Sequence, residues 1–212
     1  MTLLNDIAVD HNEIVINGVS WETYESLLED LFQSGQHKRV FYDRGRLVIL
    51  SPLPKHEKWK SLLGCFVEAI ADVRQIPIST YGQTTWKRRD LERGLEPDEC
   101  FYVQHEPQMR GKLEIDLMVD PPPDLCIEID LRRGGVDKAD IYAAMGINEV
   151  WHHRRDQIEA LVLHPDGTYR VSEMSAAFPF LQPADLKQFL EAFGTTDQNS
   201  LIRQVRQWAR TL

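Results

Sequence analysis

The stretch LCIEIDL at residues 125–131 alternates apolar and polar side chains, as a β-strand does. Successive side chains of a strand point to opposite faces, so the four aliphatic residues share one face while Glu128 and Asp130 share the other with Cys126. Two neighbouring carboxylates are costly to bury unless a cation neutralises them. The stretch therefore predicts a strand that carries either a metal-binding pair or, if this face meets solvent, two ordinary surface acids.

A third carboxylate lies about 30 residues before Glu128, where Pro97-Asp98 opens another apolar run at 98–103. This spacing suits a neighbouring strand of the same sheet, with the proline at the strand entry. Pro-Asp is also common in turns, so the step alone leaves both interpretations open.

The rest of the chain alternates strands and helices without a regular βαβ repeat, which favours an α/β or α+β fold with a mixed β-sheet. The triple proline at 121–123 stops the segment before the central strand. Hydrophobic periodicity predicts the other elements. Strands are expected at 13–16, 40–42, 47–50, 76–81, 84–87, 149–152, 158–163 and 168–172, and helices at 21–31, 55–70, 137–145, 184–193 and 198–212.

Composition places the chain among ordinary globular proteins, with 42% hydrophobic and 27% charged residues. It contains no apolar run long enough to cross a bilayer and no secretory leader, so we expect a cytoplasmic protein without membrane contact. The formal charge of -9 argues against coating nucleic acid by bulk charge, but a nucleic-acid enzyme needs only a local positive strip. Three widely spaced cysteines form no CxxC pair and are expected to be small buried hydrophobes.

Taken in order, these features resemble the Uma2 family of restriction-endonuclease-like proteins. The resemblance rests on Pro97-Asp98, on Glu128-x-Asp130 and on DKADIYAAMGINEVW at 137–151. It extends through RLVILSPLPKHEKWK (46–60), TTWKRRDLERGLEPDE (84–99), EIDLMVDPPPDL (114–125) and AFPF (177–180), and so covers most of the chain.

The resemblance implies a fold similar to that of the PD-(D/E)XK nucleases, with Asp98 and Glu128 holding Mg²⁺, or Mn²⁺ as a substitute. The Ile129 carbonyl is a further candidate ligand, and Asp130 is either a third ligand or the mark of a lost lysine. It also implies hydrolysis of DNA phosphodiester bonds, a reaction that a hard cation can promote. One domain is expected over 1–212, with an N-terminal extension at 1–50, a catalytic core at 51–175 and C-terminal helices at 176–212.

The lysine of the nuclease pattern is missing, because its position two residues after Glu128 holds Asp130. Lys138 is the main substitute, since it precedes Ile141, Tyr142 and Met145 at helical spacing and would point toward the sheet. A first-turn lysine that reaches water is the alternative. Arg132 and Arg133 could neutralise charge but could not act as a base.

Other candidates carry less weight. His56, at the edge of the apolar face of the helix at 55–70, would position water or phosphate, or would simply hydrogen-bond at the helix start. A second Glu-x-Asp at 114–116 suits an edge segment, and His152-His153 is expected at the surface. Basic clusters at 55–60, 87–93 and 132–133 could follow a phosphate backbone if they converge.

Two other classes of function remain open. A nuclease scaffold that has lost its lysine could serve as a nucleic-acid-binding or protein-interaction module, because a fold does not guarantee activity. The last helix carries Leu201, Val205, Trp208 and Leu212 in one stripe, which either covers the core or builds a homodimer.

Overall fold

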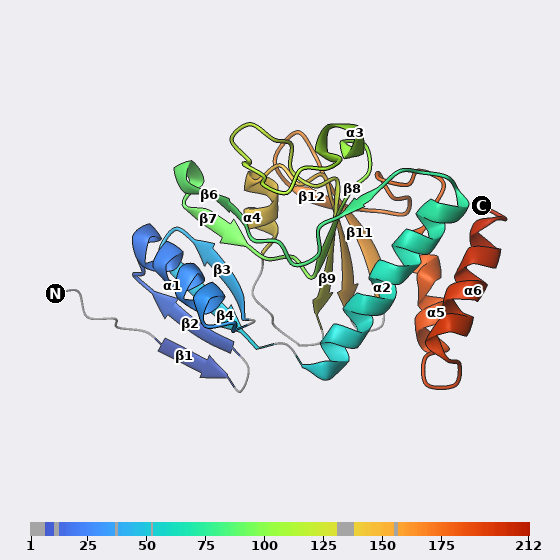
Figure 1. Ribbon diagram of the computed structural model, residues 1–212, viewed down its shortest axis with the longest axis horizontal. Helices are drawn as coiled ribbons and strands as arrows, with labels where there is room; N and C mark the ends of the chain where they lie inside the picture. Colours follow the sequence, from blue (N-terminus) through green and yellow to red (C-terminus); the bar gives the residue numbers. More distant parts are fainter. Residues whose placement is uncertain (1–6, 11–12, 37, 52, 131–137, 155–156) are drawn as a thin grey trace. The chain divides into compact units, whose positions relative to one another are not determined.

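The computed structural model describes residues 7–10, 13–36, 38–51, 53–130, 138–154 and 157–212 (Figure 1). The chain forms two compact units, each with a six-stranded sheet. The first contains residues 1–53 and 84–96, and the second contains residues 54–83 and 97–212. The prediction of a single domain with boundaries at 50 and 175 stays a prediction.

The first unit is an antiparallel sheet of strand order β1-β2-β4-β3-β7-β6 with one helix, α1. Ser20 caps α1 through a hydrogen bond from the Thr23 amide, which satisfies one of the free amides of the first turn. The β3–β4 hairpin turns on Arg44 and Gly45, whose positive φ angles of 45° and 92° match the twist of the strands. Its elements are β1 (Ile7–Asp10), β2 (Glu13–Asn17), α1 (Trp21–Gln33), β3 (Arg39–Asp43), β4 (Arg46–Leu50), β6 (Trp86–Arg88), the 3-10 turn η1 (Arg89–Leu91) and β7 (Arg93–Leu95).

Strand β7 is not among the strands predicted from the sequence. Its central residue is Gly94, and a side chain would collide with α1, because a Cβ there would lie 2.0 Å from the hydroxyl oxygen of Tyr24. The Tyr24 ring in turn stacks on Tyr42 of β3, with the ring centroids 4.8 Å apart. Close packing against an aromatic ring thus explains why this strand lacks the usual β-branched residues.

The second unit is a mixed sheet of order β12-β11-β10-β9-β8-β5, in which β9 and β10 run parallel and the other described pairs are antiparallel. This confirms the predicted mixed α+β sheet with residues 125–130 in a central strand. Its elements are α2 (Pro54–Val73), β5 (Ser79–Thr80), β8 (Glu99–Tyr102), α3 (Glu106–Met109), β9 (Leu125–Asp130), α4 (Ala139–Ala144), β10 (Glu149–Arg154), β11 (Gln157–Leu163), β12 (Tyr169–Ser172), the 3-10 turn η2 (Pro183–Leu186), α5 (Lys187–Glu191) and α6 (Gln198–Ala209).

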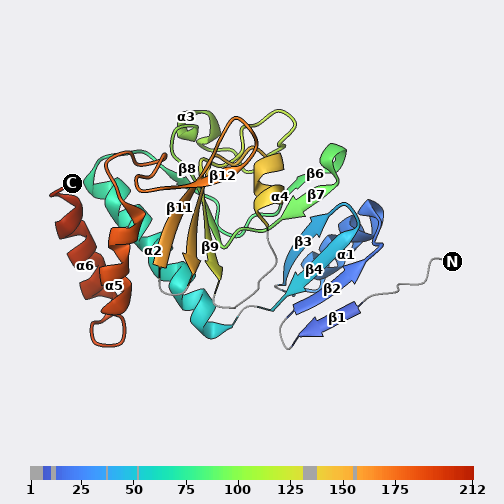
Figure 2. The same cartoon turned by 180° about the vertical axis from the view of Figure 1, so that it is seen from behind.

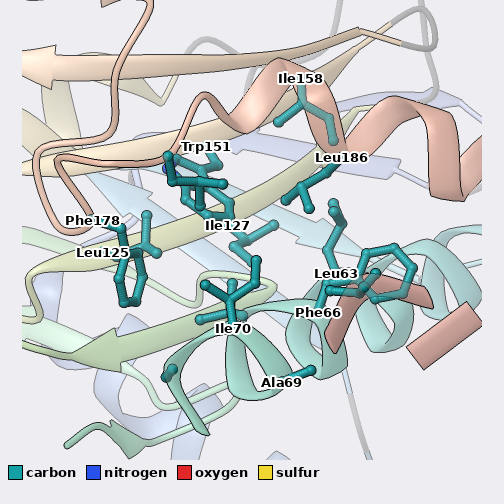
Figure 3. Close-up of a cluster of buried hydrophobic side chains, with 14 of the residues drawn as sticks. Leu63, Phe66, Ala69, Ile70, Leu125, Ile127, Trp151, Ile158, Phe178 and Leu186 are labelled. Carbon is teal, nitrogen blue, oxygen red and sulfur yellow. The ribbon is translucent and has the colours of Figure 1, made fainter. Parts of the chain in front are cut away.

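The core of the second unit lies between this sheet and α2 (Figure 3). Leu125 and Ile127 of β9 belong to the same buried cluster as Phe66 and Ile70 of α2, while α4 lies on the opposite side of the sheet from α2 in both ribbon views (Figures 1 and 2). The predicted alternation of β9 is therefore confirmed. Its aliphatic face is the core face, and its acidic face looks the other way.

The C-terminal helix α6 packs against α2. Leu201 and Val205 are fully buried in the core of the second unit, and Trp208 and Leu212 pack partly against it. The apolar stripe of this helix therefore covers its own unit, and a homodimer stays a prediction. In the described residues, no helix combines the length and the apolar character that crossing a membrane requires.

Candidate functional site

Asp98 is fully buried immediately before β8. Its Oδ2 accepts a hydrogen bond from the Ile129 amide at 2.6 Å, and its own amide donates to the Ile127 carbonyl at 3.1 Å. Because β8 and β9 pair antiparallel with Glu99 opposite Ile127, Asp98 lies alongside Glu128. The chain thus brings the first two predicted acids to neighbouring positions on adjacent strands.

Glu128 is buried on the face of β9 away from α2, and two of its partners are the N-cap residue and a residue of α4. The ammonium nitrogen of Lys138 lies 2.5 Å from Oε2, and the Tyr142 hydroxyl donates to Oε1. Lys138 caps α4 and Tyr142 follows four residues later, so both donors extend from the same side of the helix. Lys138 therefore points toward the sheet, as its spacing predicts, while its chemical role stays a prediction.

His56 stands in the first turn of α2 with its side chain only 12% exposed. Its Nε2 lies 3.1 Å from Oδ2 of Asp98, and its Nδ1 lies 3.3 Å from Oε1 of Glu57. The imidazole therefore bridges the buried aspartate and an acid on the helix surface. This agrees with the inward position expected for His56, and it fixes the orientation of the Asp98 carboxylate.

Asp130 has a different environment from Glu128 although both share one face of β9. It is only partly buried, and its Oδ2 lies 3.8 Å from Nε2 of His152 and 3.7 Å from Nε of Arg154, both on β10. The lysine position of the nuclease pattern is therefore filled by an acid that faces basic side chains of the next strand.

The chain is similar to known proteins over most of its length. The model of the Uma2 family, described as "Putative restriction endonuclease", matches residues 21–210. The chain belongs to the Uma2 family. Among solved structures, it is similar to a crystal structure titled as a putative nuclease belonging to DUF820 from Anabaena variabilis. That chain is 15% identical, the match covers 80% of this chain and 90% of that one, and the TM-score is 0.46. No curated protein matched.

Tyr142 is the residue of this Uma2 chain that sequence reasoning missed as part of the site. Its position four residues after Lys138 was used only to orient the helix, although the same spacing signals that both polar tips reach the same target. Because its hydroxyl donates to Glu128, the helix holds this carboxylate by two contacts rather than one.

The histidine pair at the end of β10 needs a correction. His153 is 2% exposed, and its ring centroid lies 5.9 Å from that of Trp59 on α2, so its predicted surface placement is wrong. His152 points to the other face and is partly exposed. Strand alternation puts the two rings on opposite faces of the sheet, and the His153 ring packs near Trp59 on the α2 face.

The basic clusters divide between the two units. In the first unit, Lys87, Arg88, Arg89 and Arg93 each form an ion pair with an acid of that unit. In the second, Lys58 donates to Oε1 of Gln198 on α6 and lies over the Phe193 ring, so it belongs to helix packing. Arg132, Arg133, the Gly134-Gly135 step and Asp137 lie outside the described residues.

A further acid, Glu99, lies next to Asp98 but on the α2 face. Burial raises its pKa, and the Lys60 ammonium partly offsets that effect. A Cβ at Gly64 of α2 would lie 3.4 Å from its Oε2, so the helix passes close to this carboxylate. The second Glu-x-Asp, at 114–116, forms neither helix nor strand, which agrees with its lower rank.

Across the part of the chain that the structure describes, no three His, Cys, Asp or Glu side chains form a group suited to a metal ion. The predicted set of Asp98, Glu128 and Asp130 therefore stays a prediction. What the structure brings together is a pair of buried carboxylates, each held by donors from a helix: His56 of α2 at Asp98, and Lys138 with Tyr142 of α4 at Glu128.

Proposed function

We propose that this Uma2 chain is a Mg²⁺-dependent nuclease that hydrolyses phosphodiester bonds of DNA. The observation that supports this most is the position of Lys138. Its ammonium reaches Glu128 from a helix, at a site where the strand itself offers Asp130 instead of a lysine. A family described in terms of restriction endonucleases makes a nucleic-acid substrate the natural expectation.

The donor set fits a hard cation. Mg²⁺ prefers oxygen ligands, keeps several waters, and is commonly bound through one or two carboxylates, so Asp98 and Glu128 would be sufficient. An ionised carboxylate has about four acceptor positions, so a hydrogen-bonded one can still bind a cation. When bound, Mg²⁺ would promote ionisation of a water and offset charge on the phosphate. Mn²⁺ has the same ligand preference.

The residues of the chain have separate tasks in this proposal. The Ile129 amide and His56 fix the orientation of the Asp98 carboxylate, and Tyr142 does the same for Glu128. Lys138 supplies the positive charge that stabilises a phosphate as its negative charge grows. Asp130 is not required as a ligand, because it faces the basic residues of β10.

The same contact also favours a second candidate, a module without activity. The Lys138 ammonium lies 2.5 Å from Glu128, so an internal cation already neutralises the carboxylate that would hold the metal. If this ion pair is permanent, the fold would bind nucleic acid or protein without cleavage. The two candidates differ in whether divalent metal binds at all.

The test is a calorimetric titration with Mg²⁺ and Mn²⁺, run beside a plasmid-nicking assay. Wild type, Asp98→Asn and Glu128→Gln are compared with the matched control Asp166→Asn, which changes an exposed carboxylate of the same unit. We expect both binding heat and nicking to disappear in the first two variants and to persist in the control. Absence of metal binding by wild type at low millimolar concentration would refute the nuclease and leave the inactive module.

A further inference from the structure

Strand β10 places two basic side chains beside the candidate acids. In the parallel pairing with β9, His152 is the partner of Glu128, and Arg154 is the partner of Asp130. Paired residues on neighbouring strands point to the same face. His152 and Arg154 therefore lie on the face that carries Glu128, one strand further from β8.

Both basic groups are oriented by one carboxylate without being saturated by it. Oδ2 of Asp130 lies 3.8 Å from Nε2 of His152 and 3.7 Å from Nε of Arg154, which is ion-pair range but too long for a hydrogen bond. Within the described part of the chain, the buried Nε of Arg154 has no hydrogen-bond acceptor. The Arg154 side chain as a whole is 41% exposed, so other N–H groups of the guanidinium are accessible to an acceptor that a ligand brings.

Mutual neutralisation on a solvated face is the simpler explanation of these charges, and Glu159, the β11 partner of His152, could contribute to it. Two facts argue against it as the whole account. Asp130 makes no short contact with either base, although their side chains are 24% and 41% exposed and could move closer. The buried Arg154 donor would also remain unsatisfied.

We propose that His152 and Arg154 form a phosphate-binding pair that holds the polynucleotide backbone beside Glu128, with Asp130 as their common anchor. A phosphodiester presents two non-bridging oxygens, which match the fixed N–H directions of a guanidinium and an adjacent imidazole. This inference rests on the proposed function, since it takes the ligand to be the polynucleotide substrate. It also gives Asp130 a role without making it a metal ligand.

The test is binding of a fluorescein-labelled DNA duplex, followed by anisotropy in EDTA and again with Ca²⁺. Arg154→Gln and His152→Asn are compared with Arg170→Gln and His164→Asn, which remove the same side chains elsewhere in the second unit. We expect Arg154→Gln to weaken binding about tenfold, the effect of losing one charge-assisted hydrogen bond. His152→Asn should weaken it less, and both controls should bind as wild type does.

The salt dependence separates a phosphate contact from a structural effect. Each lost phosphate contact lowers the slope of log affinity against log salt by about 0.9 for duplex DNA. Arg154→Gln should therefore show the smaller slope, and Arg154→Lys should restore the slope and part of the affinity. Thermal melting of each variant shows whether the fold is intact.

The proposal is overturned if both site variants bind duplex as the controls do, or if wild type binds no duplex in either condition. It is also overturned if Arg154→Gln weakens binding of inorganic phosphate but not of duplex, since the pair would then be a site for small anions. Binding and nicking fail independently. If Arg154→Gln loses duplex binding and wild type does not nick DNA, the phosphate-binding pair is supported and the nuclease is refuted. If wild type nicks DNA and Arg154→Gln binds duplex as wild type does, the nuclease is supported and the pair is refuted.

Discussion

The ammonium nitrogen of Lys138 lies 2.5 Å from Oε2 of Glu128, and both groups are largely buried. Together with the Tyr142 hydroxyl, this ammonium offsets part of the cost of burying the Glu128 carboxylate. If Mg²⁺ binds Glu128, Lys138 must share the carboxylate with it. Lys138 should then stabilise the fold, lower the affinity for metal and support catalysis.

Replacing Lys138 by Met should separate these effects. The variant leaves Glu128 buried without its ion-pair partner, so the free energy of unfolding should fall by about 2–4 kcal/mol, and added Mg²⁺ should recover part of the loss. Metal affinity measured by calorimetry should be unchanged or higher, while nicking should fall about 100-fold or more. Lys187→Met, which removes a partly exposed lysine paired with Glu191, is the control. Loss of metal binding together with nicking would contradict the assignment.

Removing the Tyr142 hydroxyl should lower the free energy of unfolding, whereas removing the Tyr24 hydroxyl should not. Tyr142→Phe takes a donor from the buried Glu128 carboxylate and should cost about 1–3 kcal/mol in urea unfolding. Tyr24→Phe removes a buried hydroxyl that has no hydrogen-bond partner among the described residues, so it should be neutral or stabilising. Equal losses in the two variants would show that Tyr142 does not hold Glu128.

Gly94→Ala should destabilise the first unit because its Cβ would lie 2.0 Å from the Tyr24 hydroxyl oxygen and 2.6 Å from Cζ. Overpacking of this kind costs about 1–3 kcal/mol. Removal of the hydroxyl relieves only the shorter of these contacts, so the double variant with Tyr24→Phe should recover part of the loss. A double-mutant cycle from urea midpoints measures this coupling, and strictly additive effects would contradict the packing argument.

The buried Glu149 should make the second unit less stable as pH rises. Burial raises the pKa of Glu149, although the Ala177 amide, Trp151 and Ser175 all donate to its carboxylate and oppose that rise. A group with a raised folded pKa contributes stability below its unfolded pKa of 4.5 and loses it as pH rises through the folded value. The unfolding free energy of wild type minus that of Glu149→Gln should therefore decrease from pH 4 to pH 7.

Asp166 is a control, because its contribution to stability should change with pH in the opposite direction to that of Glu149. Hydrogen bonds from Thr168 lower the pKa of Asp166 to about 2. Its contribution is therefore present above the unfolded pKa of 3.8 and is lost as pH falls through about 2. Asp166→Asn should thus change stability much more at neutral pH than at pH 2. A rising difference between wild type and Glu149→Gln, with this control behaving as stated, would show that Glu149 is ionised in the folded protein.

Asp130→Asn should distinguish a metal ligand from an anchor. Because Asp130 faces His152 and Arg154, we expect Mg²⁺ affinity to change by no more than about threefold, whereas Glu128→Gln abolishes it. Calorimetric titration of both variants measures the difference. Equal loss of metal binding would restore Asp130 as a third ligand.

Sequence patterns predicted the parts of the site that depend on local periodicity. The period of two in residues 125–130 predicted that Glu128 faces away from the core, and helical spacing predicted that Lys138 points toward the sheet. The Ser20 cap of α1 and the Arg44-Gly45 turn of the β3–β4 hairpin likewise arise from local contacts. Each of these depends on φ/ψ geometry within a few residues, which the chain encodes directly.

Apart from the neighbouring strands at 98–103 and 125–131, pairing between distant segments was not visible in the sequence. Strand β7 returns to the N-terminal sheet because Gly94 fits against Tyr24, and β10 lies parallel to β9, which brings His152 beside Glu128. The sequence by itself determined most of the helices and strands, the Uma2 resemblance and the shared face of Glu128 and Asp130. Only the tertiary structure decided which donors meet those acids, because strand order and helix docking depend on burial summed over the whole unit rather than on any one segment.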